Sequence, residues 1–320
     1  MRRLTTLALA LCLATTAFAD DDILRRGFNV SEGGTLRLHA DLGAIKVVSG
    51  GTGVAIEVVR KPRGERGEER MRAHRIEFRQ SGNDVIIDDE LEGRNNWFSW
   101  SGERYDVQWN IRVPARYNVD LRTSGSSIDL ADIGGTVDAR TSGGGIRTGR
   151  IANTATLNTS GGSIKVDGAN GTVIAHTSGG SIDIGNTTGA VEARTSGGSI
   201  RLGRSGGEVV ARTSGGGIRI EEAMGTVDAT TSGGSIQASI ARQPASDSSF
   251  STSGGSITVT LARGIGAELD ARASGGGVSS DVPITVQGTQ RSGVLQGRIN
   301  SGGPKLTVRT SGGSIKIKNS

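Results

Sequence analysis

The sequence predicts an all-β fold, a single-stranded parallel β-solenoid with two faces and 18-residue coils. Three observations support this prediction: a six-residue motif recurs at constant spacing, apolar and polar residues alternate, and aliphatic positions recur every nine residues. Copies of Thr-Ser-Gly-Gly-Ser/Gly-Ile begin 18 residues apart at Thr141, Thr159, Thr177, Thr195, Thr213 and Thr231, and a variant begins at Thr123. Constant spacing of this kind is typical of a repeat architecture and excludes disorder.

Each repeat holds two short strands. Val191, Ala193 and Thr195 share one register, and the charged Glu192 and Arg194 lie between them, which is the period of a strand with one buried face. Apolar anchors recur every nine residues, half a repeat, throughout the regular region. This spacing predicts a flattened coil with two sheets, because a triangular coil would place aliphatic residues every six positions.

Stacking places each residue over its equivalent in the next coil, roughly 4.8 Å away along the axis. We expect the threonines from Thr141 to Thr231 to form an inward ladder whose hydroxyls bond along the stack. The isoleucines from Ile146 to Ile236 form the other inner column. A single coil cannot bury its own apolar face, so its neighbours must supply the rest of the core.

The second turn of each coil carries its own pattern. Glycine recurs in register at Gly135, Gly171, Gly189, Gly207 and Gly225, and the missing member is Asn153. Asparagine is the residue that most often replaces glycine where φ is positive. We therefore predict a left-handed turn at these six positions, with a structural role and no part in phosphate binding.

The N-terminus has the features of a signal peptide. Met1-Arg2-Arg3 is basic, Leu4 to Ala14 is apolar, and Ala17-Phe18-Ala19 is a small-x-small cleavage site. We expect cleavage after residue 19, which makes residues 20–320 the mature chain. The apolar run is too short to anchor the protein in a bilayer, and no other segment is long enough.

The mature chain is predicted to be a single domain. Residues 20–120 are expected to form degenerate, larger coils, because the seven- and nine-residue steps of the repeats continue through Leu38, Ile45 and Val54. A charged loop at 60–75, with a short helix over 68–74, and an aromatic loop at 91–106 interrupt them. Regular coils occupy 121–240. Residues 241–320 form irregular coils, with motif copies at Thr252, Ala273 and Thr310.

Composition limits the functional classes. Removing residues 1–19 removes two arginines and no acids, so the formal net charge falls from +5 to +3. Charges of both signs are interspersed, which argues against a nucleic-acid-binding protein. The only cysteine, Cys12, lies in the signal peptide, so the mature chain has neither a disulfide nor a cysteine metal site.

The sequence resembles a known bacterial family. The motifs are Asn110-Ile111-Arg112-Val113-Pro114 before the first repeat, Gly297 to Pro304 near the end, and the final Thr310-Ser311-Gly312-Gly313-Ser314-Ile315. They are similar to those of the "putative adhesin" family, a domain of unknown function found on exported proteins. The resemblance covers nearly all of the mature chain. It implies a β-solenoid outside the cytoplasm and no catalytic residues.

Three groups of exposed residues are candidates for ligand binding. Two outward columns are basic and lie on opposite faces: Arg140, Arg194 and Arg212 form one, and Arg147, Lys165, Arg201 and Arg219 form the other. Such columns suit anionic glycans or an envelope surface. Acids lie two residues before Arg140 and Arg194, and they would neutralise the first of these two columns. Trp97 and Trp100, in the aromatic loop, either stack on sugars or cap the end of the solenoid.

Other kinds of site find less support. A calcium roll needs aspartate in every repeat, but the residue after the motif alternates between aspartate, arginine and lysine. His39, His74 and His176 lack metal-ligand spacing, and the acids at 88–90 are read as a solvated turn. We therefore expect a non-enzymatic, exported, adhesin-like or envelope scaffold protein without a cofactor. The alternative is a carbohydrate-active enzyme, a lyase or hydrolase, on the same scaffold.

Overall fold

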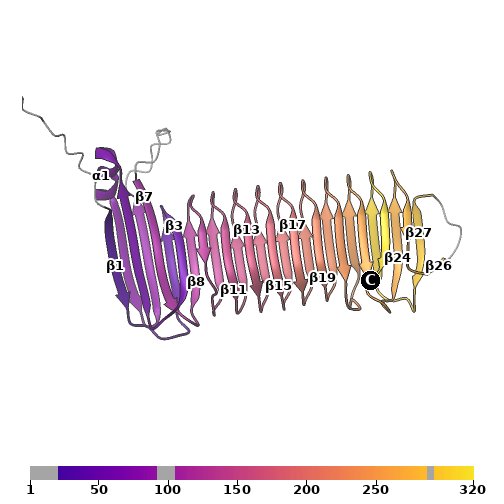
Figure 1. Cartoon of the computed structure of the whole chain (residues 1–320), viewed down its shortest axis with the longest axis horizontal. Coiled ribbons are helices and arrows are strands. Elements are labelled where there is room, and N and C mark those ends of the chain that lie inside the picture. Colours follow the sequence, from indigo (N-terminus) through magenta and orange to yellow (C-terminus); the bar gives the residue numbers. More distant parts are fainter. Residues whose placement is uncertain (1–20, 92–104, 287–291) are drawn as a thin grey trace, which may run out of the picture.

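A computed structural model describes residues 21–91, 105–286 and 292–320. The predicted signal peptide, Trp97 and Trp100 therefore lie outside the described residues. The chain forms a long, flattened rod whose strands run across the long axis (Figure 1). Two sheets make the two faces: sheet A has 14 strands and sheet B has 15. The predicted fold class is confirmed.

The regular coils alternate between the sheets. In sheet A they are β9 (Ile128–Leu130), β11 (Ile146–Ile151), β13 (Ile164–Ala169), β15 (Ile182–Thr187), β17 (Ile200–Ser205), β19 (Ile218–Ala223), β21 (Ile236–Ile240) and β23 (Ile257–Leu261). In sheet B they are β8 (Asn118–Thr123), β10 (Val137–Thr141), β12 (Ala155–Asn158), β14 (Val173–His176), β16 (Val191–Arg194), β18 (Val209–Arg212), β20 (Val227–Thr231) and β22 (Ser248–Thr252). Neighbours are parallel and 18 residues apart up to β20 and β21, as in the pairing of Ile146 with Ile164, and β22 and β23 follow 21 residues later.

The interior is a stack of aliphatic ladders closed at one edge by threonine. Ile146, Ile164 and their equivalents are at most 2% exposed. The threonines face inward, as predicted, but their hydroxyls do not bond to one another. Each donates to a backbone carbonyl of the preceding coil, as Thr195 Oγ1 does to Gly180 O at 2.8 Å. The buried hydroxyls are therefore satisfied while they tie adjacent coils together.

The N-terminal region differs from the predicted degenerate coils. Its strands are β1 (Asp22–Phe28), β2 (Thr35–Ala40), β3 (Ala44–Gly51), β4 (Val54–Pro62), β5 (His74–Ser81), β6 (Asp84–Leu91) and β7 (Tyr105–Pro114). Only β2, β3, β6 and β7 form parallel coils, whereas β1, β4 and β5 pair antiparallel. The prediction was wrong for these three strands, because inward residues have the same spacing in either strand direction. At Gly82, φ is +59° and the chain reverses between β5 and β6.

The charged segment at 60–75 contains a helix, as expected, but at a different position. Helix α1 spans Gly64–Arg72, whereas the sequence placed it at 68–74. It follows β4 at the N-terminal end of the rod (Figure 1). Met71 packs against the core, so the helix covers part of that end.

The C-terminal strands do not stack in sequence order. They are β24 (Ala267–Ala273), β25 (Val278–Ser280), β26 (Ile284–Val286), β27 (Val294–Ile299), β28 (Lys305–Thr310) and β29 (Ile315–Asn319). The last coil, β28 and β29, lies between β22/β23 and β24/β25. Thr310 thus stacks on Thr252, and its hydroxyl bonds to Gly255 O at 2.7 Å. Ala273 has no hydroxyl for this contact and stacks one coil further out.

The N-terminal end has the same arrangement. The coil of β2 and β3 lies between the coil of β6 and β7 and that of β8 and β9. Antiparallel strands then close each end: β1, β4 and β5 at one, β26 and β27 at the other. A terminal coil inserted between two others therefore holds each end of the regular stack.

The left-handed turn predicted at the second-turn glycines is wrong. None of Gly135, Asn153, Gly171, Gly189, Gly207 and Gly225 has a positive φ. These positions do lie in turns, and glycine is favoured there because the coils approach closely. A Cβ on Gly189 would lie 2.5 Å from the carbonyl carbon of Gly171. Asn153 shows that one such turn accommodates a side chain.

Candidate functional site

The two basic columns lie on opposite faces, where the sequence placed them. In sheet B, the column of Arg140, Arg194 and Arg212 runs beside a mixed column in which Asp138, Glu192 and Asp228 alternate with uncharged residues. Arg140 makes two hydrogen bonds to Asp138 at 2.9 and 3.0 Å, and Arg194 pairs with Glu192 at 2.9 Å. Arg212 pairs with Asp228 in the next coil, and this hydrogen bond raises the pKa of Arg212. Each of the three cations thus has a carboxylate beside it.

The predicted charged column of sheet A has an excess of cations. In register, it contains Lys46, Asp129, Arg147, Lys165, Asp183, Arg201, Arg219 and Lys316. Arg147 pairs with Asp129 at 3.2 Å, and Lys165 is 3.9 Å from Asp167. The sequence-predicted members of this column are therefore only partly neutralised.

Arg201 and Arg219 lie opposite each other on β17 and β19. They line a shallow hollow of about 420 Å³ together with the serine positions Ser181, Ser199 and Ser235. Arg219 bonds to Glu221 at 2.5 Å, which raises the pKa of Arg219 and lowers that of Glu221. Arg201 forms no ion pair with any residue that the structure describes. Like charges directly opposite on a sheet repel. Asp183 of β15 lies opposite Arg201 on its other side and lines the same hollow, which therefore contains two arginines and one aspartate.

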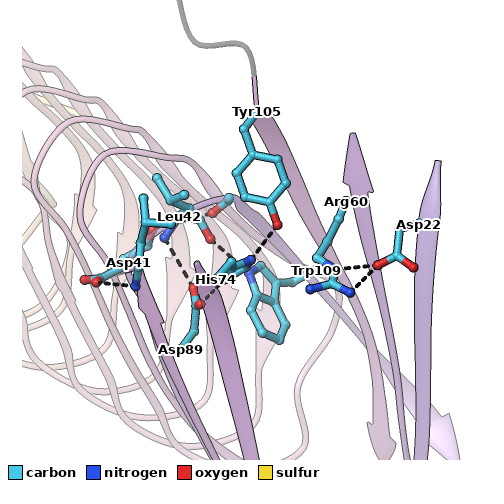
Figure 2. A network of polar contacts seen from close by, with 11 residues as sticks. Asp22, Asp41, Leu42, Arg60, His74, Asp89, Tyr105 and Trp109 are labelled. Atoms are coloured by element: carbon cyan, nitrogen blue, oxygen red, sulfur yellow. Dashed lines mark hydrogen bonds and ion pairs between the residues drawn. The ribbon is translucent and has the colours of Figure 1, made fainter. Parts of the chain in front are cut away.

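A buried polar network lies at the N-terminal end of the rod (Figure 2). His74 on β5 contacts Asp89 on β6 through Nε2 and the hydroxyl of Tyr105 on β7 through Nδ1, the latter at 2.6 Å. Asp89 also accepts the backbone N–H of Leu42 at 3.4 Å, and Trp109 Nε1 donates to Leu42 O at 3.0 Å. The network therefore joins sheet B to sheet A.

Both ring nitrogens of His74 have a partner within the network. Burial raises the pKa of Tyr105 well above its usual range, so its hydroxyl stays protonated and donates to His74 Nδ1. The Nε2–H group then donates to Asp89. The side chains of His74 and Asp89 are fully buried, so neither touches solvent. This geometry positions strands and offers no surface on which a substrate would bind.

The sequence reading missed this network. The acids at 88–90 were interpreted as a solvated turn, but Asp89 is 7% exposed and lies in β6. Asp89 follows Val85 and Ile87 at two-residue steps, and this alternation could have predicted that its side chain points inward. Within residues 21–91, 105–286 and 292–320, no group of three or more histidines, cysteines and acids could hold a metal ion. No described helix is long and apolar enough to cross a bilayer.

A family model, the Toastrack domain DUF4097, matches residues 65–318. The chain belongs to this family. The match covers the regular coils and the C-terminal end, and agrees with the resemblance stated from the motifs. No curated protein sequence matches this Toastrack chain.

Three solved structures resemble this Toastrack protein at low identity. A "putative cell adhesion protein" from Clostridium sporogenes is 11% identical with a TM-score of 0.24, and the match covers 94% of this chain and all of that one. A "putative adhesin" from Bacteroides fragilis is 13% identical with a TM-score of 0.28, covering 93% and 97%. A "putative lipid binding protein" from Parabacteroides distasonis is 12% identical with a TM-score of 0.37, covering 93% and 97%. The assignment therefore rests on the family model.

Proposed function

We propose that the protein is an exported, non-enzymatic, adhesin-like interaction module that binds anionic glycans of an envelope surface through sheet A. The observation that carries the proposal is the partly neutralised cation column of this face, with Arg201 and Arg219 beside a hollow. The basic and apolar segment at 1–19 supports export. The rigid stack supports a scaffold, because it repeats cationic positions at fixed intervals.

The geometry favours sheet A over sheet B. On sheet B each predicted arginine pairs with a neighbouring acid, so an incoming anion would have to displace a carboxylate. On sheet A, Arg201 forms no ion pair among the described residues, although its charge helps to lower the pKa of Glu221. Ser181 and Ser199 border the same hollow with groups that suit sugar hydroxyls. Long-range attraction by such a column is screened by salt, so the interaction should weaken as ionic strength rises.

A glycan array containing uronate, sulfated and neutral glycans tests the proposal. We expect residues 20–320 to bind the anionic glycans at low salt. The double variant Arg201→Ala/Arg219→Ala removes both guanidinium groups of the hollow and should lose at least about tenfold in affinity. Arg194→Ala/Arg212→Ala on sheet B is the matched control and should bind like the unchanged protein. Equal losses in both variants, or no binding at any salt, would refute the role of sheet A.

The same samples address the alternative of a carbohydrate-active enzyme. Bound glycans are recovered after long incubation and their chain lengths measured. An adhesin-like module leaves them intact, whereas shortened chains or unsaturated ends would refute the non-enzymatic part of the proposal.

A further inference from the structure

A long hollow runs along one edge of the rod, away from the sheet A column. It has a volume of about 910 Å³. It follows the turns that leave sheet A, from Asp132 in the first regular coil to Arg242 six coils later. At roughly 4.8 Å a coil, the hollow is about 29 Å long. We call it the edge groove.

Small residues make the groove and long cations border it. Arg150, Gly168, Asn186 and Arg204 occupy the same position in four successive coils, so the two arginines stand at either end of a trough. Two residues further along the chain, the equivalent position in successive coils is occupied by small residues: Gly134, Ala152, Asn170, Thr188 and Gly206. Arg242 lies two coils beyond Arg204. The backbones of the three arginines are thus spaced by about three and two coils, roughly 14 and 10 Å.

The lining of the groove carries three arginines and two aspartates, Asp132 and Asp167, so its formal net charge is +1. Asp132 accepts the backbone N–H of Arg150 at 2.8 Å, and Asp167 lies 3.9 Å from Lys165 on the face of sheet A. Arg204 is 3.9 Å from Glu222, a loose pair on the surface. Within the part of the chain that the structure describes, Arg150 and Arg242 form no ion pair.

We infer that the edge groove binds an extended acidic polysaccharide whose chain runs along the solenoid axis. Guanidinium groups recognise carboxylates or sulfates, and the amides of Asn170 and Asn186 and the hydroxyl of Thr188 suit sugar hydroxyls. A linear chain matches a straight groove with repeated polar positions. None of the lining residues is aromatic, which disfavours a single-stranded nucleic acid, whose bases stack on aromatic side chains.

This site is separate from the sheet A column, so it can exist whether or not the proposed function holds. Arg150, Arg204 and Arg242 project from the edge, whereas Arg201 and Arg219 project from the face. A chain bound in the groove would contact several coils at once, and its affinity should depend on its length through effective concentration.

The test measures binding of oligogalacturonates of two and eight residues to residues 20–320 by calorimetry. We expect the octamer to bind at least about tenfold more tightly than the dimer, and neutral dextran not to bind. The triple variant Arg150→Ala/Arg204→Ala/Arg242→Ala should lose about tenfold or more for the octamer. The sheet A variant Arg201→Ala/Arg219→Ala should retain the length dependence, which separates failure of this site from failure of the proposed function.

A second variant keeps all three cations. Ala152→Leu places an apolar side chain at the exposed floor of the groove and should weaken octamer binding without altering the net charge. Equal affinities for dimer and octamer, or unchanged octamer binding by the triple variant, would overturn the inference. Tighter binding of oligothymidylate than of the octamer would overturn the assignment to a polysaccharide.

Discussion

Replacing Gly198 by alanine tests the close stacking of the coils. A Cβ on Gly198 would lie 2.1 Å from the carbonyl oxygen of Gly180 and 2.4 Å from its carbon, both in the preceding coil. This oxygen also accepts the Thr195 hydroxyl at 2.8 Å. The φ of Gly198 is not positive, so the effect of a methyl group there is steric. To reach an ordinary contact distance, the two turns must separate by about 1 Å and weaken that hydrogen bond.

The expected cost follows from these contacts. Overpacking in a closely packed interior costs about 1–3 kcal/mol, and loss of the threonine hydrogen bond costs about 1 kcal/mol. The lower backbone entropy of alanine in the unfolded chain offsets about 0.4–1 kcal/mol. We therefore expect the free energy of unfolding of Gly198→Ala to fall by about 1–4 kcal/mol.

Gly125→Ala is the matched control. Gly125 is in the variant motif of the first coil, has no atom within 4 Å of its would-be Cβ, and its φ is not positive. This variant should be as stable as the unchanged protein or slightly more stable. Urea unfolding of residues 20–320, followed by circular dichroism, measures both. If Gly198→Ala unfolds at the same urea concentration as Gly125→Ala, close backbone stacking does not explain the glycines of the motif.

Two further predictions concern the C-terminal end. Deleting residues 305–320 removes the coil between β22/β23 and β24/β25. Limited proteolysis should then cleave residues 262–304 first, while residues 121–240 resist. An unchanged cleavage map would contradict the insertion of this coil between the other two. Burial alone would raise the pKa of Asp270, but hydrogen bonds from Gln296 and Arg272 and the charge of Arg309 lower it below its unfolded value of about 3.9. Its stabilising effect is therefore present above about pH 4 and is lost as the pH falls through the lowered pKa. Asp270→Asn should cost about 1 kcal/mol at pH 7 and less below pH 4; a pH-independent difference would contradict this.

The regular coils were predictable because the constraint on them is local and repeated. Each Thr-Ser-Gly-Gly-Ser-Ile copy contains an inward threonine, a glycine at a close contact and an inward isoleucine, and parallel stacking gives every copy the same environment. The second-turn glycines were found in the correct turns for the wrong reason. A pattern of glycine and asparagine cannot separate a positive φ from close approach of two backbones.

The candidate sites were predictable only in part. Outward columns follow from period-two alternation, so the positions of Arg140 and Arg201 on opposite faces were accessible from the sequence. Which column is neutralised depends on the acids that sheet pairing brings beside it, such as Asp228 beside Arg212 in the next coil. The edge groove depends on which turn residues are small in several successive coils, and its shape appears only when those coils stack.

The linear sequence established the coil length, the two faces and the inward ladders, because one repeat and its neighbours contain all the interactions that define them. The ends of the rod were decided by tertiary structure alone. Three features depend on contacts between distant segments. They are the direction of β1, β4 and β5, the insertion of β28 and β29 between earlier coils, and the contacts of His74 with Asp89 and Tyr105. A strand with alternating residues buries the same side chains whichever way it runs and whichever strand it pairs with. Its direction and its partner are therefore decided only by which arrangement of the whole fold packs best.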